Sequence, residues 1–240
     1  MKKLCLLVTP LLSLPVAADW QDTADLIGET FSVSVSKSDF LGNSSTNDDL
    51  TYTLYGSHNL NEKWRIFGQA DTDRFLEAGV GYSFILVDQI YNEVTTSVGG
   101  NDDNVMVYSA GLFSAVSWND FVFYSNFSSQ YIDNPYIGPE WLTEKIRKER
   151  ISLDKTFGTF YDVNSWLSAS LSYTHEATHY EKFKWKNSKK YREYDYEQYV
   201  SPGITLNIFG VKPTISYNYY FDDKSPKEKS YFDFSLNFDF

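Results

Sequence analysis

The chain has 240 residues, a single cysteine and a formal net charge of −11, with 32 acidic against 21 basic side chains. This acidic balance argues against a nucleic-acid-binding protein, and a lone cysteine, Cys5, excludes a cysteine-built metal site or an internal disulfide. Aromatic residues make up 18% of the chain, yet no stretch after residue 18 approaches the ~20 apolar residues of a transmembrane helix.

The first 18 residues carry the three parts of a secretory signal peptide. Lys2 and Lys3 form a positive start, an apolar run continues to Val16, and small residues follow at Ala17 and Ala18. The run is too short to span a bilayer as a helix. We therefore expect residues 1–18 to be a signal peptide and residues 19–240 to form one domain, with a retained N-terminal anchor as the alternative.

Strict alternation of apolar and polar residues dominates the rest of the chain. It is clear in segments 76–84, 106–112, 167–174, 200–208 and 211–221, where the polar face holds mostly Ser, Thr, Gly and Asn. Only helices and closed β-barrels cross a bilayer, because every backbone polar group there needs a partner. Such strands behind a signal peptide predict a transmembrane barrel whose small polar face lines the lumen.

Short and long polar turns alternate between these segments, as in barrels with short periplasmic turns and longer outer loops. We expect an all-β fold, a single antiparallel up-and-down barrel of about twelve strands, with ten to fourteen possible. An even number puts both ends of the barrel on the periplasmic side. The expected strands are 30–40, 50–60, 64–71, 74–86, 91–99, 105–118, 121–131, 146–157, 164–176, 193–208, 211–221 and 230–240.

The last segment shows the alternation most cleanly, with apolar residues at Phe232, Phe234, Leu236, Phe238 and Phe240. It resembles the C-terminal strand by which Gram-negative outer-membrane barrel proteins are read by the barrel-assembly machinery. The whole domain also resembles, in architecture, the small twelve-stranded porin-like families, including the oligogalacturonate-specific porins. The resemblance implies an outer-membrane location, and we expect a monomer that passes small polar solutes through a narrow pore.

Charged residues with lumen-facing parity are the candidates for controlling such a pore. They are Arg65, Asp71, Glu77, Arg150, Asp154, Lys212, Asp233 and Asp239. Acidic residues outnumber basic ones in this set, which predicts a weak cation preference. Dense tracks of inward Arg and Lys are missing from the pattern, and this argues against an acidic-sugar substrate. Two alternatives stay open: a non-conducting surface barrel (adhesin, phage receptor or structural protein), and a barrel enzyme acting on lipid, peptide or lipopolysaccharide.

A basic segment follows the expected strand 164–176 and is assigned to an outer loop. Its cations are Lys182, Lys184, Lys186, Lys189, Lys190 and Arg192. Attraction to anionic headgroups favours a rim that contacts outer-membrane lipid and lipopolysaccharide. A funnel for an anionic solute and a polymer-binding surface are the alternatives.

Residues 175–179, His-Glu-Ala-Thr-His, match a zinc-protease pattern that requires a helix. Here the pattern continues a strand, and in an extended chain the two histidines lie about 13 Å apart at roughly 3.3 Å per residue, too far to share one zinc ion. The outward neighbours expected at the height of His175, from Glu149 and Ile151 to Gln198, include no serine nucleophile. We therefore expect no metal, no cofactor and no enzyme activity, although an Asp195–His179 pair stays open.

Overall fold

The computed structural model describes residues 30–37, 50–72, 74–86, 90–102, 104–134, 147–185, 188–192, 194–221 and 230–239. The expected signal peptide and Phe240 lie outside this part of the chain. The described part of the chain contains no helix that is long and apolar enough to cross a membrane.

Thirteen antiparallel strands form a single sheet in the described chain. They are β1 (Thr30–Lys37), β2 (Leu50–Asn59), β3 (Trp64–Asp71), β4 (Leu76–Leu86), β5 (Ile90–Gly100), β6 (Met106–Trp118), β7 (Phe121–Asn134), β8 (Arg147–Asn164), β9 (Leu167–Trp185), β10 (Ser188–Arg192), β11 (Asp195–Leu206), β12 (Val211–Tyr220) and β13 (Tyr231–Asp239).

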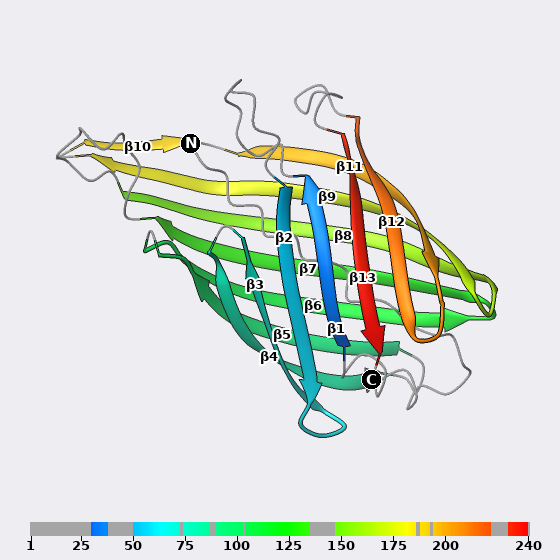
Figure 1. Ribbon diagram of the computed structural model, residues 1–240. Coiled ribbons are helices and arrows are strands. Elements are labelled where there is room, and N and C mark those ends of the chain that lie inside the picture. The colour runs from blue at the N-terminus through cyan, green and yellow to red at the C-terminus, as the bar shows by residue number, and fades with distance from the viewer. Residues whose placement is uncertain are drawn as a thin grey trace.

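The sheet closes on itself into a barrel. Strand β1 pairs with both β13 and β2, and β9 pairs with both β8 and β11. Strand β10 is paired only with the far end of β9 among the described residues, so the closed ring consists of the other twelve strands. Figure 1 shows β1 and β13 side by side where the chain closes the ring. The predicted antiparallel up-and-down barrel of about twelve strands is confirmed.

Two of the expected strand boundaries are wrong, and both errors concern β8 and β9. The expected strands 146–157 and 164–176 place a short turn between them, near Tyr161, but these residues lie inside β8 and the chain instead turns at residues 165–166. The predicted outer loop 177–193 is largely strand, because β9 continues to Trp185 and folds back on β10. The backbone of β9 pairs with β8 as far as Lys184, whose partner is Arg147, and this pairing extends β9 beyond its expected end.

The barrel has an apolar outside and a polar inside, the reverse of a soluble protein. Leu54 is 46% exposed, whereas Arg65 is 4% exposed and Glu93 is 2% exposed. Phe232 and Phe234 of the last strand are also exposed, while Ser235 is buried. An apolar surface of this size is stable only against another apolar phase, and the alternation of the strands directs it outward.

The turns define the two ends of the barrel. The short-turn end has connections of residues 60–63, 87–89, 119–120, 165–166 and 207–210, and the long-loop end has the connections 38–49, 135–146 and 221–230 together with two tight turns. In Figure 1 the end of β13 and the turn from β2 to β3 lie at the same end of the barrel.

Candidate functional site

A cavity of 250 Å³ lies inside the barrel, and inward side chains from most of the strands line it. Strands β9, β11, β12 and β13 line it mainly with hydroxyl and amide side chains, which include Ser172, Ser201, Thr214, Ser216, Asn218 and Ser235. In the ring these strands lie opposite β3 to β6. The facing and flanking strands add aromatic residues, namely Tyr55, Phe67, Phe113, Tyr124 and Phe160.

A buried ion pair lines this cavity. The Arg65 Nε and Nη2 atoms both donate to Glu93 Oε1, at 3.0 and 2.6 Å, and Nη1 donates to the Tyr55 hydroxyl at 3.1 Å. The guanidinium also lies over the Phe67 ring, 5.4 Å from its centroid. Gly81 makes room for the pair, because a Cβ there would meet Glu93 Oε1 at 1.9 Å. The ion pair with Glu93 therefore fixes the position of the Arg65 side chain.

Two further carboxylates line the cavity without a basic partner at hydrogen-bonding distance in the described structure. Glu77 accepts hydrogen bonds from Gln69 Nε2, at 2.7 Å, and from the Ser97 hydroxyl. Asp233 lies on β13, within the hydroxyl-rich wall. Since Arg65 and Glu93 cancel one another, these two carboxylates leave the cavity with an acidic excess.

A row of three acidic residues crosses the inner wall nearer the long-loop end. Asp154 on β8 is paired in register with Glu176 on β9, which is paired with Glu197 on β11. The Tyr199 hydroxyl donates to Glu176 Oε1 at 2.9 Å. Farther out, Lys148 forms an ion pair with Glu181. The acidic excess thus continues from the cavity toward the mouth.

The structure brings only some of the eight predicted lumen residues into one place. Arg65, Glu77 and Asp233 line the cavity, Asp154 and Arg150 lie on the inner face of β8 toward the long-loop end, and Lys212 is buried on β12. Asp71 is the last residue of β3, and its carboxylate accepts a hydrogen bond from the Phe75 amide of the adjacent turn at 3.0 Å. The side chain of Asp239 lies outside the described part of the chain.

Sequence reasoning misses Glu93, Glu176 and Glu197. Each has the parity of an inward residue, since Val94 and Val98 on β5, and Val200 and Ile204 on β11, define the apolar face. The alternation of apolar and polar residues in these strands is therefore sufficient to predict that all three glutamates face inward. Glu176 also falls within the zinc-protease pattern.

Inward glycines let the aromatic rings lie close against the wall. A Cβ at Gly79 would be 2.3 Å from the Phe67 ring, and one at Gly158 would be 2.4 Å from the Tyr124 ring. Because a ring occupies the space of the missing side chain, these pairs set the shape of the cavity. Tyr124 also stacks between Phe113 and Phe160, with ring centroids 6.1 and 5.2 Å apart.

The zinc-protease pattern lies in a strand, as expected. His175 faces outward with its Nε2 3.3 Å from the Tyr194 hydroxyl, whereas Glu176 faces the lumen. A bulge in the pairing of β8 with β9 falls at His179, and the described residues contain no cluster of three or more potential metal ligands. The partner of His175 on β8 is Lys155, not Glu149 or Ile151 as expected, because β8 extends farther toward the short-turn end.

Basic residues gather where β8, β9 and β10 meet at the long-loop end. Lys184 is paired in register with Arg147 on one side and Lys189 on the other. Lys182 lies 3.6 Å from Glu149, and Arg147 donates to Asp133 at 2.8 Å. The remaining predicted basic residues lie in strand β10 or outside the described chain, so the patch sits on a strand extension rather than a loop.

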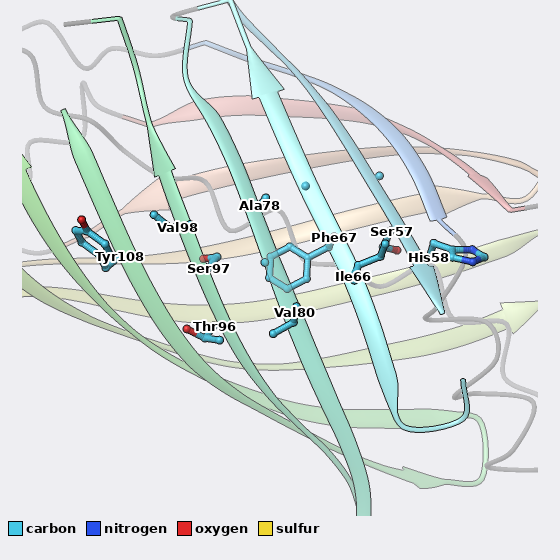
Figure 2. Close-up of a pocket in the computed structure, with 13 residues that line it drawn as sticks. Ser57, His58, Ile66, Phe67, Ala78, Val80, Thr96, Ser97, Val98 and Tyr108 are labelled. Atoms are coloured by element: carbon cyan, nitrogen blue, oxygen red, sulfur yellow. The ribbon is translucent and has the colours of Figure 1, made fainter. Parts of the chain in front are cut away.

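A second hollow lies on the outer wall, across β2 to β5 (Figure 2). Gly56, Gly68 and Ala78 are cross-strand neighbours, so three adjacent strands lack large outward side chains in one row. Ile66, Val80 and Tyr108 are among the larger residues around this groove of 810 Å³. This groove opens on the apolar side of the barrel, away from the inner cavity.

No protein-family model and no curated protein sequence matches the chain. Solved structures do match over most of its length. An outer membrane channel from Pseudomonas putida F1 matches with a TM-score of 0.60 and 12% identity, covering 97% of this chain and 98% of that one. The chain has the fold of the small outer-membrane porins.

Two further structures support this assignment. The KdgM porin, solved in complex with disordered oligogalacturonate, matches with a TM-score of 0.58 and 9% identity, covering 88% of this chain and 99% of that one. The NanC porin matches with a TM-score of 0.57 and 13% identity, covering 89% and 99%. At these identities the likeness concerns the porin fold alone.

Proposed function

We propose that this protein is a passive outer-membrane pore for small polar solutes, with a weak preference for cations over anions. The observation that carries the proposal is the polar cavity inside a barrel whose outer surface is apolar. A closed barrel of twelve strands lies between the filled eight-stranded barrels and the open sixteen-stranded porins. Small side chains on β9, β11, β12 and β13 leave space that larger residues would fill.

The cation preference follows from the charges on the inner face. Glu77 and Asp233 line the cavity, and the row of Asp154, Glu176 and Glu197 lies between the cavity and the mouth. In a narrow pore with low-dielectric walls, fixed acidic charges concentrate cations and repel anions. Arg65 does not offset them, since Glu93 already neutralises it. Arg150, on the inner face of β8, interacts electrostatically with Asp154 and Glu176 and offsets one of the three charges of the row.

Two partners complete the proposal. The barrel-assembly machinery would read the last strand, whose Phe232 and Phe234 face outward. Lipopolysaccharide would meet the basic residues at the junction of β8, β9 and β10, because anionic headgroups attract such clusters. The barrel would function as a monomer in the outer membrane of a Gram-negative bacterium.

Swelling of proteoliposomes tests the proposal directly. Vesicles containing the purified barrel are placed in iso-osmotic lysine or glutamate, which are similar in size and opposite in net charge. We expect swelling in both solutes and faster swelling in lysine. The Glu77→Gln, Asp233→Asn variant should reduce the difference, and 1 M salt should also reduce it, because the Debye length falls from ~10 Å at 0.1 M to ~3 Å.

The outcomes separate the alternatives. No swelling in any small solute, from a barrel shown to be folded, would remove the pore and favour the non-conducting surface barrel. Faster swelling in glutamate would still support a pore, but it would mean that the basic cluster at the rim controls which solutes enter.

A further inference from the structure

We infer that the groove on the outer wall seats an acyl chain of lipid A, the membrane anchor of lipopolysaccharide, and that this chain enters from the long-loop end of the barrel. This seat rests on the proposed contact with lipopolysaccharide and extends it to a second, deeper place on the wall, whether or not the barrel conducts. Three features support it: the shape of the groove, its direction across the strands, and the side chains at its outer end.

The floor of the groove is bare sheet. Gly56, Gly68 and Ala78 follow one another across β2, β3 and β4, and a Cβ on Gly56 would have no atom within 4 Å. On the short-turn side the next outward row contains Ile66 and Val80, which are 41% and 39% exposed. Successive outward rows lie about 7 Å apart along a strand, so the missing row leaves a trough about one hydrocarbon chain wide.

The lining suits hydrocarbon rather than a polar ligand. Leu54 and Leu76 are exposed on the long-loop side of the trough. The backbone of the floor is paired within the sheet, and the outward Thr96 hydroxyl donates to the Ser109 carbonyl at 3.2 Å. An occupant therefore gains apolar contact there without bringing hydrogen-bonding groups of its own.

The groove crosses the strands and climbs the wall. It extends from Gly56, three residues before the short-turn end of β2, to Tyr108, two residues after the long-loop start of β6. Figure 2 shows His58 and Tyr108 at opposite ends of this line. An acyl chain anchored at the outer boundary of the bilayer descends in the same sense, from Tyr108 toward Gly56.

This direction argues against a second copy of the barrel as the occupant. From β2 to β6 the groove covers four of the twelve strand-to-strand steps of the ring, a third of its circumference. Two barrels that stand side by side touch along a line parallel to their axes and curve away from each other on both sides of it. A neighbouring wall therefore cannot follow the groove, whereas a flexible chain can.

Aromatic and basic side chains mark the outer end of the groove. The Tyr108 ring lies 6.2 Å from the Tyr131 ring on β7, and tyrosines favour the membrane–water boundary. Arg147 on β8 and Lys182 on β9 interact electrostatically with Tyr131. The same rim holds two lysines in one row with Arg147 and two carboxylates that pair with the cations, namely Lys184, Lys189, Asp133 and Glu149. Cations outnumber carboxylates, so this rim attracts phosphate.

The separation of these cations from the groove favours lipid A over a phospholipid. Strands β8 and β9 lie two and three strands from β6, which is roughly 10–14 Å at the usual spacing of strands. In a phospholipid both chains descend beneath a single phosphate. Lipid A carries several chains on a disaccharide with a phosphate at each end, so a phosphate reaches Arg147 while a chain enters the groove beside Tyr108.

Native mass spectrometry of the purified barrel, refolded in detergent, tests this seat. Hexa-acylated lipid A with two phosphates is compared at equal concentration with dipalmitoyl phosphatidylglycerol, which is also anionic but has one phosphate and two chains. We expect one bound lipid A per barrel, with an affinity about tenfold higher than that of the phospholipid.

Matched variants on the lipid side locate the chain. Ala78→Leu fills the floor of the groove and should weaken lipid A binding about tenfold, as expected for the lost burial of about two methylene groups. Gly56→Leu fills the floor from β2, where the added side chain has open space, and should act in the same way. Ala169→Leu makes the matched exchange on β9, where Tyr161 and Ile204 are its exposed neighbours, and should leave binding unchanged.

The outcomes separate the groove from the rim. Equal binding of the two lipids, or lipid A binding that Ala78→Leu and Gly56→Leu leave unchanged, would overturn the inference. If binding survives in the groove variants but is lost in Arg147→Gln with Lys182→Gln, the proposed contact at the rim stands and the groove assignment fails. A dimer that Ala78→Leu abolishes would assign the groove to a second copy of the chain and would also overturn the inference. The two groove variants lie on different strands, so the test stands if one of them does not fold.

Discussion

Removing the Arg65 guanidinium should be among the most destabilising single changes in the barrel wall. The side chains of Arg65 and Glu93 are 5% and 3% exposed, and Arg65 makes two hydrogen bonds to Glu93 and one to Tyr55. The variant Arg65→Met keeps much of the side-chain volume but leaves the Glu93 carboxylate buried without its cation. Breaking a buried pair in this way costs about 3–5 kcal/mol.

Urea-induced unfolding of the barrel in lipid vesicles, followed by tryptophan fluorescence, measures this loss of free energy of unfolding. Asp102→Asn provides a matched control, since it breaks the Arg74–Asp102 pair, whose side chains are 78% and 50% exposed. Exposed pairs contribute about 0–1 kcal/mol. The double variant Arg65→Met, Glu93→Leu removes both charges and should recover most of the loss.

The reasoning would be refuted if Arg65→Met destabilised the barrel no more than Asp102→Asn does. It would also be refuted if the double variant were less stable than Arg65→Met alone, because the cost is assigned to the charge left behind. Such a result would mean that water reaches Glu93 and solvates it in place of Arg65.

Three more predictions concern the inner charges, the zinc-protease pattern and the last strand. Neutralising Glu77 and Asp233 together should lower the ratio of cation to anion permeability measured from the reversal potential, whereas an unchanged ratio would locate selectivity elsewhere. His175→Ala should leave metal content unaltered in elemental analysis, and stoichiometric zinc that disappears with this change would restore the zinc-site hypothesis. Deletion of Phe240 should sharply lower the amount of barrel in outer-membrane fractions, and normal insertion of both this deletion and the Phe238→Asp, Phe240→Asp double variant would contradict the assembly signal.

The architecture is predictable from the sequence because apolar and polar residues alternate along each barrel strand, and this alternation shows which side chains face outward and which face the lumen. The parity of Leu76 to Phe84, for example, is enough to place Glu77 in the lumen, and Glu77 does line the inner cavity. Period-2 alternation does not fix where a strand ends, however. Tyr161-Asp162 has turn-like residues, so the sequence predicts a turn before the strand actually ends. Pairing with β9 extends β8 to Asn164.

The candidate site is less predictable, since parity assigns a face but not a neighbour. Arg65 and Glu93 are 28 positions apart, and their contact depends on how β3, β4 and β5 are staggered. Asp71 shows the converse, because it has the parity of the cavity residues Arg65 and Gln69 but its carboxylate accepts a hydrogen bond from the adjacent turn. The stacking of Tyr124 between Phe113 and Phe160 likewise depends on the register between β6, β7 and β8, which alternation alone leaves open.

The most direct test of the central claim is the conductance of the purified, folded barrel in a planar bilayer under a salt gradient. We predict discrete current steps and a reversal potential that favours cations, because acidic side chains dominate the inner face from Glu77 and Asp233 to the row at Glu176. A folded barrel that inserts into the bilayer but produces no current steps would contradict the account and make a non-conducting surface protein the better description.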